Sequence, residues 1–191
     1  MSHSSSALVE RPWCVALVGN PNCGKTDLFN LLTGARQKVA NYAGVTVERK
    51  VGSATLRDGR TISVVDLPGA YSLSPATPDE QITLEVIEGR RAGEDAPDAI
   101  VAVVDATNLR MNLRLVLELG RLGRPMIVAL NMADVARSQG LVIDAAALAS
   151  ELGCPVVETV AIRRHGHDAL LAQIAAQIGS APPPTAIDNP V

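Results

Sequence analysis

The fold of this 191-residue chain is decided by the stretch Gly19-Asn20-Pro21-Asn22-Cys23-Gly24-Lys25-Thr26. It matches G-x-x-x-x-G-K-[ST], the pattern of a phosphate-binding loop. Residues 14–18 before it form an apolar run that predicts a buried strand, and residues 27–32 after it are typical of the start of a helix. Glycines let backbone N–H groups turn toward a phosphate, and the helix N-terminus adds a partial positive charge. We therefore expect the eight residues, and Asp27 directly after them, to bind a nucleotide.

Two side chains of this loop have distinct expected roles. Lys25 would reach the β- and γ-phosphates, and the Thr26 hydroxyl would ligate Mg²⁺. The alternative is a chance match in a glycine-containing loop. Three further nucleotide motifs that follow in the right order argue against it.

Composition excludes several classes of protein. The net charge is −3 and only 2% of the residues are aromatic, so the chain has neither the basic footprint nor the stacking side chains of a nucleic-acid binder. The three cysteines form no C-x-x-C pair and are interpreted as reduced thiols. No apolar run approaches the roughly 20 residues that span a bilayer.

Apolar runs alternate with helical patterns along the chain, which predicts an α/β fold with helices on both faces of a sheet. The turn signal at 57–60 predicts one antiparallel hairpin. We expect a six-stranded, mostly parallel sheet of the Ras-like P-loop GTPase type. Expected strands are 13–19, 47–56, 61–66, 99–105, 126–131 and 155–160, and expected helices are 25–33, 79–91, 112–122, 144–152 and 168–178.

The domain organisation follows from the ends of the chain. Residues 1–11 are interpreted as a disordered lead-in, 12–179 as one GTP-binding domain, and 180–191 as a proline-rich linker or disordered tail. Within the domain, segments 37–46 and 71–78 are polar and are expected to be mobile loops.

A second motif, Asp66-Leu67-Pro68-Gly69, follows an apolar strand. Asp66 can hold a Mg²⁺-bound water, and the Gly69 N–H can meet a γ-phosphate. The alternative is a turn initiated by an aspartate. About forty residues after a phosphate loop, the nucleotide interpretation is stronger.

A third motif, Asn131-Met132-Ala133-Asp134, follows another apolar run. A carboxylate at Asp134 accepts two hydrogen bonds from the N1–H and N2–H₂ edge of guanine, which adenine lacks. Asn131 would tie the base to the phosphate loop, with Met132 beside it. The alternative is a strand-end asparagine and an exposed aspartate.

A fourth feature is Thr46, in Gly44-Val45-Thr46-Val47-Glu48. Small GTPases place their second Mg²⁺-ligating hydroxyl in a mobile loop at this point, with Gly44 and Val45 next to the nucleotide. A strand threonine chosen for its β propensity is the alternative, and it would be favoured if Thr46 stood alone.

Longer runs resemble one family in particular. They are Gly34-Ala35-Arg36-Gln37-Lys38-Val39-Ala40-Asn41-Tyr42-Ala43-Gly44-Val45-Thr46-Val47-Glu48-Arg49-Lys50, then Asp66-Leu67-Pro68-Gly69-Ala70-Tyr71-Ser72-Leu73 and Val104-Asp105-Ala106-Thr107-Asn108-Leu109. Together they resemble the ferrous iron transport protein B family (FeoB) over roughly 13–178. These motifs separate the family from generic GTPases.

The resemblance implies a location and partners. FeoB proteins are Fe²⁺ transporters of the bacterial inner membrane, with a cytosolic N-terminal G domain followed by a helical domain and a transmembrane region. This chain would be the G domain, itself soluble, on the cytoplasmic face of the membrane. Its partners would be GTP or GDP and the downstream helical and transmembrane regions, with a homo-oligomer as a further expectation.

The resemblance also implies how GTP is hydrolysed. Ala70 stands where Ras-like proteins carry a water-orienting glutamine. The family uses a bound K⁺ instead, held by the side chain at Asn22 and by carbonyls around Asn41 and Tyr42, where the family usually has tryptophan. Such an ion would do the electrostatic work of an arginine finger. The expected catalytic residues are Asn22, Lys25, Thr46 and Gly69; the expected Mg²⁺ ligands are Thr26, Thr46 and Asp66.

Three positions depart from the family pattern. Cys23 is interpreted as a small tolerated residue, with a low-pKa thiolate as the alternative. Asp27 adds a carboxylate to the first turn of a helix, where it suits the helix dipole. Third, the guanine-cradling serine becomes alanine in Val160-Ala161-Ile162. The hydroxyl is lost, so guanine preference is expected to be relaxed, and ATP becomes a further possible substrate.

Alternatives for the whole chain remain open. His165 and His167 could suggest an iron site, but an exposed loop with Asp168 as a helix cap is the preferred interpretation. A free-standing Era-like GTPase linked to the ribosome or RNA is one rival function. A nucleotide-binding regulatory module with incidental hydrolysis is the other.

Overall fold

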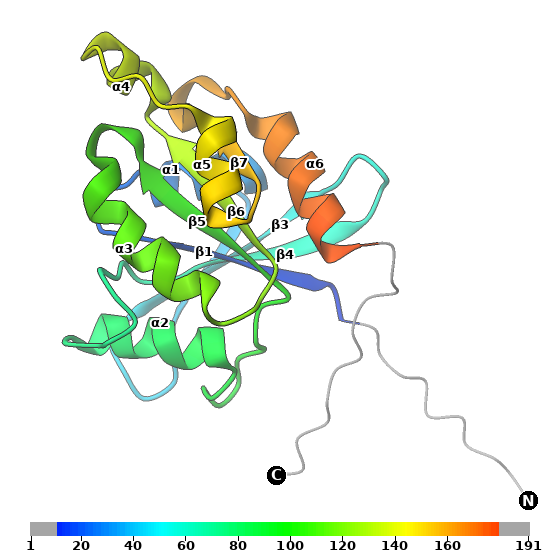
Figure 1. The fold of residues 1–191 in the computed structure, drawn as a ribbon. Coiled ribbons are helices and arrows are strands. Elements are labelled where there is room, and N and C mark those ends of the chain that lie inside the picture. The colour runs from blue at the N-terminus through cyan, green and yellow to red at the C-terminus, as the bar shows by residue number, and fades with distance from the viewer. Residues whose placement is uncertain (1–10, 180–191) are drawn as a thin grey trace, which may run out of the picture.

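A sheet flanked by two layers of helices organises the structure, a computed structural model that describes residues 11–179 (Figure 1). Within this range seven strands pair in the order β2-β3-β4-β1-β5-β6-β7. The predicted α/β fold is confirmed. The predicted tail over 180–191, and all of the predicted lead-in except Arg11, lie outside the described residues. The strands are β1 Trp13–Gly19, β2 Gln37–Asn41, β3 Glu48–Thr55, β4 Thr61–Asp66, β5 Ala99–Asp105, β6 Met126–Asn131 and β7 Val156–Glu158.

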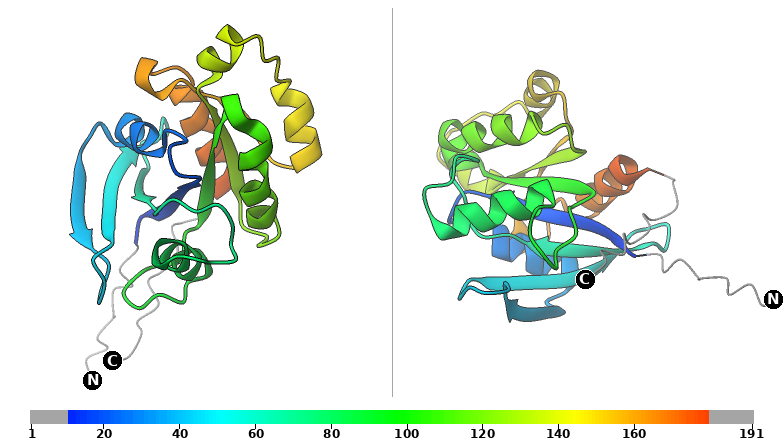
Figure 2. Two further views of the ribbon diagram at one scale, coloured as in Figure 1. Left: turned by 90° about the vertical axis from the view of Figure 1, so that its left-hand side faces the viewer. Right: turned by 90° about the horizontal axis from the view of Figure 1, so that it is seen from below.

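Helices cover the two faces of the sheet through separate apolar clusters (Figure 2). Helices α1 and α6 pack on one face, and α2 and α3 pack on the other with parts of α4 and α5. Their bounds are α1 Lys25–Thr33, α2 Pro78–Glu88, α3 Leu109–Gly120, α4 Ala133–Ser138, α5 Ala145–Leu152 and α6 His167–Ile178, with short 3₁₀ turns at Ala106–Asn108 and Ala161–Arg163. No helix in the described part of the chain is long and apolar enough to cross a bilayer.

The central strands are parallel because both of their faces are covered. Strand β1 pairs in parallel with β4 and β5, and β5 pairs in parallel with β6. Their side chains are almost all buried, which is typical of parallel strands between two helical layers. The carboxyl ends of these strands meet at one edge of the sheet, so the loops that follow β1, β4 and β6 lie together.

The predicted count of six strands is wrong, because β2 forms within the segment expected to be a mobile loop. It pairs antiparallel with β3, from Gln37 opposite Gly52 to Asn41 opposite Glu48. All five β2 side chains are exposed. An edge strand with no buried face carries no apolar alternation, so its sequence resembles that of a loop.

The predicted hairpin between β3 and β4 is confirmed. The Leu56 N–H donates to the Arg60 carbonyl at 2.8 Å, and Gly59 has a φ of 87°, in the left-handed region. Strand β3 is the strand that runs against the rest of the sheet. Arg60 also donates to the Gly179 carbonyl at 2.5 Å, which ties this hairpin to the end of α6.

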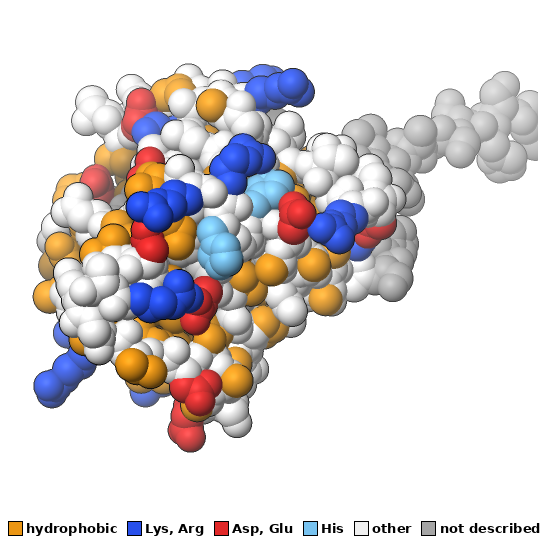
Figure 3. Space-filling model, turned by 90° about the horizontal axis from the view of Figure 1, so that it is seen from above, with side chains coloured by type: hydrophobic (Ala, Val, Ile, Leu, Met, Phe, Trp, Pro, Cys, Tyr) orange, Lys and Arg blue, Asp and Glu red, His pale blue; other side chains and the backbone are white. Residues whose placement is uncertain are grey.

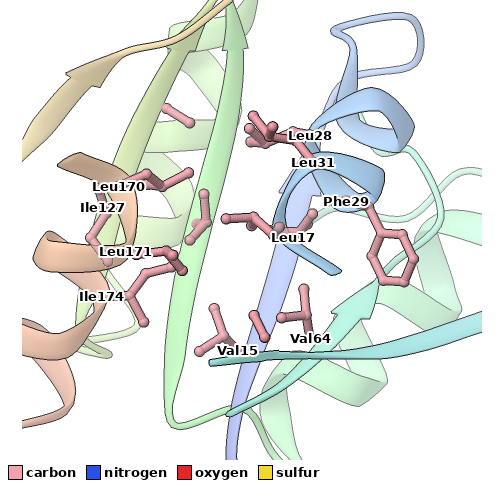
Figure 4. Close-up of a cluster of buried hydrophobic side chains, with 14 of the residues drawn as sticks. Val15, Leu17, Leu28, Phe29, Leu31, Val64, Ile127, Leu170, Leu171 and Ile174 are labelled. Atoms are coloured by element: carbon pink, nitrogen blue, oxygen red, sulfur yellow. The ribbon is translucent and has the colours of Figure 1, made fainter. Parts of the chain in front are cut away.

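The core beneath α1 holds the phosphate loop in place. Val15 and Leu17 of β1 point into a cluster with Leu28 of α1 and with Leu170 and Ile174 of α6 (Figure 4). Leu17 is completely buried. Because β1 and α1 are fixed on either side of residues 20–24, that loop has little freedom to change its shape.

We expect Leu17→Ala to lower the free energy of unfolding by about 3–5 kcal/mol, because it leaves a cavity in this cluster. Urea denaturation is the measurement. The matched control is Leu117→Ala on α3, where the side chain is 54% exposed, and its effect should stay within about 0.5 kcal/mol. Equal losses in the two variants would contradict the assignment of Leu17 to the core.

Candidate nucleotide-binding site

The loop between β1 and α1 has the backbone of a phosphate-binding loop. Asn22 and Gly24 adopt left-handed φ values of 65° and 82°, and the Cys23 N–H donates to the Asn20 carbonyl at 3.3 Å. A Cβ atom on Gly24 would lie 2.2 Å from Nδ2 of Asn131, so only glycine fits there. Gly24 directly precedes α1, whose first N–H groups face the loop. Asp27 lies in the first turn of α1, as expected.

Two predicted site residues from different parts of the sequence meet directly. The Lys25 ammonium donates to the Asp66 carboxylate, and both side chains are largely buried. A buried charge is stable only when it is paired, so each group holds the other until a phosphate or a cation takes its place.

Oxygen ligands of the kind that Mg²⁺ prefers are present at this point. Thr26 is the neighbour of Lys25 and is exposed, and Asp66 ends β4. A hydroxyl and a carboxylate fit Mg²⁺, which usually keeps several waters and takes its remaining ligands from substrate phosphates. Residues 11–179 contain no cluster of three or more His, Cys, Asp or Glu side chains that could hold a metal ion.

The segment after β4 packs against the phosphate loop. Leu67 N–H donates to the Leu17 carbonyl at 3.2 Å, and Ala70 N–H donates to the Gly19 carbonyl at 3.1 Å. A Cβ atom on Gly69 would lie 3.0 Å from Cγ of Pro21. The structure therefore brings Gly69 next to the phosphate loop, and the expected contact of its N–H with a γ-phosphate stays a prediction.

Residues 70–77, here called the switch loop, wrap around a buried carboxylate that the sequence analysis missed. Glu80 accepts hydrogen bonds from the Ala76 N–H at 2.8 Å and the Tyr71 N–H at 3.0 Å. These backbone hydrogen bonds, that of Ala76 foremost, lower the pKa of Glu80. A lowered pKa means that the stabilisation is present above the usual glutamate pKa and is lost as the pH falls through the folded value. The signal was the capping box Thr77-x-x-Glu80, in which Thr77 caps α2.

Asn131 is the junction between the phosphate loop and the loops after β6 and β7. Its Nδ2 donates to the Cys23 carbonyl of the phosphate loop at 3.2 Å, and its expected contact with a base stays a prediction. Its Oδ1 accepts from the Thr159 hydroxyl and from the Ala161 N–H, both at 3.2 Å. Three chain segments are therefore fixed by one buried side-chain amide.

Thr159 is a second residue that the sequence analysis missed. It is fully buried, directly after β7, and its hydroxyl reaches Asn131 from two positions before Ala161. Thr159 and Ala161 of the same loop thus both donate to Asn131, one through a hydroxyl and one through a backbone N–H. No sequence motif identifies Thr159, because the local sequence around a buried strand-end threonine is the same whether or not its hydroxyl contacts an asparagine.

The other predicted base-contacting residues lie on the same two loops. Met132 has a φ of 59° and its Cε would lie 3.4 Å from a Cβ on Gly24, so it packs toward the phosphate loop. Asp134 forms an ion pair with Arg163 at 3.6 Å. Val160 is buried, whereas Ile162 is 76% exposed.

Residues 42–47, here called the switch turn, connect β2 to β3. Thr46 is exposed, and Gly44 has a φ of 77°. Among the described residues no hydrogen bond joins Thr46, Gly44, Val45, Asn41 or Tyr42 to the phosphate loop. The Tyr42 carbonyl accepts from Val45 N–H at 3.2 Å instead. The strand register places Asn41 past the level of Asp66, so the turn extends beyond the carboxyl edge of the sheet.

Cys23 is a neutral thiol in this loop. It is 1% exposed, and burial raises its pKa to about 11. The low-pKa thiolate alternative is therefore wrong, because the desolvation of a thiolate outweighs the nearby Lys25 charge.

The two histidines lie on a mixed surface (Figure 3). His165 is exposed, and His167 Nδ1 lies 2.9 Å from Asp168. Asp168 is not the cap of α6, because the helix begins one residue earlier and Gly166 precedes it. The iron-site alternative gains no support here, since the described residues hold no metal-binding cluster.

Comparisons with known proteins agree with this geometry. A family model described as Ferrous iron transport protein B matches residues 13–174. The Fe(2+) transporter FeoB of Salmonella typhimurium is 52% identical over 160 residues, and that of Escherichia coli (strain K12) is 50% identical. Each match covers 82% of this chain, which spans about a fifth of the length of these relatives.

Solved structures share the fold. A GDP-bound point mutant of S. thermophilus NFeoB superposes with a TM-score of 0.78 at 43% identity, covering 86% of this chain and 61% of that one. The cytosolic domain of T. maritima FeoB in its GMPPNP form gives a TM-score of 0.81 at 39% identity, covering 92% and 68%. The FeoB G-domain of Methanococcus jannaschii gives 0.75 at 36% identity, covering 88% and 98%.

We expect Thr159→Val to loosen the junction at Asn131 and to cost about 1 kcal/mol of unfolding free energy, because one hydrogen bond is lost while the shape is kept. Amide hydrogen exchange at Ala161 should become faster. Thr33→Val is the control, since that hydroxyl only donates back to the Phe29 carbonyl within α1. Unchanged exchange at Ala161 would show that its N–H alone holds Asn131.

Proposed function

Because this chain belongs to the ferrous iron transport protein B family, we propose that it is the GTP-binding, slowly GTP-hydrolysing switch domain of a bacterial ferrous iron transporter. The observation that carries the proposal is the junction at Asn131. There the Asn131 side chain, from a guanine-type N-x-x-D motif, donates to the Cys23 carbonyl of the phosphate loop. The GDP-bound S. thermophilus relative supports the same ligand.

In the proposed complex, one set of residues binds the phosphates and Mg²⁺, and another set binds the base. Backbone N–H groups of residues 20 and 22–26 and the Lys25 ammonium would hold the phosphates, with Lys25 exchanging Asp66 for phosphate. Thr26, Asp66 and Thr46 would hold Mg²⁺, which supplies positive charge against the phosphate oxygens when bound. Asp134 would read the guanine edge, and the Ile162 N–H would approach the guanine O6.

Hydrolysis needs a group other than residue 70 to stabilise the developing charge. Ala70 is fully buried and its N–H is engaged by Gly19, so it cannot orient a water. Asn22 is exposed on the outer side of the phosphate loop and is free to bind a K⁺ between the loop and the phosphates. In this proposal Asn41 and Tyr42 supply carbonyl ligands after the switch turn has moved.

Such a domain would act on the rest of the transporter by changing its conformation. The relatives are about four times as long as this chain, so the switch loop and switch turn would signal to helical and transmembrane regions of the same transporter. The domain would act on the cytoplasmic face of the bacterial inner membrane, as a monomer or within a homo-oligomer.

The first test of this function combines two variants. Lys25→Ala should abolish binding of fluorescent GDP and GTP analogues, because the phosphate charge loses its partner. Thr46→Ala should keep GDP affinity and impair hydrolysis, since that residue would meet only the triphosphate state. Lys38→Ala, on exposed β2, is the control. Wild-type turnover in Thr46→Ala would refute its role in the site.

The second test concerns the monovalent ion. We expect faster GTP hydrolysis in K⁺ than in Na⁺ at equal ionic strength, and we expect the difference to vanish in Asn22→Ala. Single-turnover rates provide the measurement. Equal wild-type rates in the two salts, together with tight nucleotide binding, would favour a regulatory module with incidental hydrolysis.

The third test concerns the base. With no serine hydroxyl at Ala161 and with Ile162 beside the guanine O6, we propose fast GDP release and ATP turnover at a measurable fraction of the GTP rate. A carboxylate at Asp134 would still find no N–H donors on the adenine edge, which should keep GTP the preferred substrate. The double variant Ala161→Ser/Ile162→Ala should slow GDP dissociation and sharpen selectivity. Strict GTP use by the wild type, unchanged in the double variant, would show that Asn131, Thr159 and Asp134 suffice.

A further inference from the structure

Tyr42, the first residue of the switch turn, is held by an arginine from a distant part of the sequence. Its ring is 1% exposed and packs in the apolar cluster beneath α2. The guanidinium carbon of Arg91 lies 5.5 Å from the centre of the ring, within the range of a cation–π contact. Arg91 follows the C-terminus of α2, the helix that continues from the switch loop.

The same guanidinium holds the backbone of the switch turn. Its Nη2 donates to the Ala43 carbonyl at 2.8 Å, and its Nη1 pairs with Glu85 of α2 at 2.8 Å. The Arg91 side chain is only 14% exposed. One planar fork therefore binds an aromatic ring, a carbonyl and a carboxylate together, which an ammonium group could not do.

Besides Arg91, two backbone hydrogen bonds close the switch turn: Tyr42 N–H donates to the Val47 carbonyl at 2.9 Å, and Val45 N–H donates to the Tyr42 carbonyl at 3.2 Å. Gly44 has a left-handed φ and a Cβ added to it would meet nothing within 4 Å, so the backbone beside Ala43 is open. Strand β3 behind the turn is fixed, because Arg49 pairs with Glu94 at 2.5 Å. The switch turn is thus held on both sides, by Arg91 at Tyr42 and Ala43 and by the Arg49–Glu94 ion pair on β3.

We propose that Arg91 is a positioning residue that latches the switch turn in its open conformation, away from the phosphates. While Arg91 binds Ala43, the exposed Thr46 has no side-chain hydrogen bond within the described residues and the Tyr42 carbonyl stays with Val45. Closure on a triphosphate requires Arg91 to release Ala43. This inference rests on the proposed function, and it adds a residue outside every nucleotide motif.

A latch of this kind changes the balance between nucleotide states. A contact made only in the open conformation opposes a ligand that binds only the closed one, and leaves alone a ligand that binds both. GDP lacks the γ-phosphate that draws the turn in. Loss of Arg91 should therefore strengthen binding of a GTP analogue without strengthening binding of GDP.

The chain contains a matched control in the neighbouring residue. Arg90 lies in the same loop and carries the same charge, but its side chain pairs with Glu88 and is 56% exposed. Removing Arg90 therefore tests the effect of net charge without touching the switch turn.

The experiment compares the wild type with Arg91→Ala, Arg91→Lys and Arg90→Ala. Dissociation constants are measured for fluorescent GDP and for a non-hydrolysable GTP analogue. For Arg91→Ala we expect the ratio of the GDP constant to the analogue constant to rise about three- to tenfold, the range of one hydrogen bond. Arg91→Lys should lie between, and Arg90→Ala should match the wild type.

A second measurement does not depend on nucleotide binding. In the nucleotide-free protein, hydrogen exchange over 43–46 should be faster in Arg91→Ala than in the wild type or in Arg90→Ala, with thermal unfolding as the check that the variant is folded. Unchanged exchange would overturn the latch, and so would an equal change in both dissociation constants. Failure of the wild type to bind GDP or the analogue would refute the proposed function, whereas the exchange result would still decide the latch.

Discussion

The side-chain amide of Asn131 is the contact on which the arrangement of the site depends. It is buried at the end of β6, and its hydrogen bonds reach the Cys23 carbonyl, the Thr159 hydroxyl and the Ala161 N–H. These groups belong to the phosphate loop and to the segment after β7. The contact also requires glycine at position 24, because a Cβ there would collide with Nδ2. The contact between Asn131 of the base motif and the phosphate loop therefore depends on the absence of a side chain at Gly24.

A parallel sheet makes this meeting possible. Strands β1, β4 and β6 end at one edge, so the loops carrying Lys25, Asp66 and Asn131 come together although they are about forty residues or more apart in sequence. Buried apolar side chains between the two helical layers hold the strand ends still. The polar groups above them can then pair with each other, as Lys25 and Asp66 do, without an additional scaffold.

The two mobile elements expected of a nucleotide switch are held in different ways. The switch loop is wrapped around the Glu80 carboxylate and is also held by Glu118 of α3 at the Leu73 N–H. The switch turn is held by the guanidinium of Arg91, which also pairs with Glu85 of α2. Helix α2 therefore contributes to both elements, since Glu80 lies at its start and Arg91 follows its end. A shift of α2 would therefore move the contacts of both the switch loop and the switch turn.

The sequence by itself determined the α/β class, the phosphate loop, the Asp66 and Asn131 motifs and the family, because each is a local pattern whose chemistry needs adjacent residues. Tertiary structure alone revealed β2, Thr159, Glu80 as a loop anchor and the grip of Arg91 on Ala43. Strand β2 has no buried face to leave a pattern, and its partner β3 defines it. Thr159 and Arg91 act on residues 28 and 48 positions away. Ordinary threonines and arginines gain a role only when folding places a particular acceptor beside them, and no spacing within the chain encodes that distance.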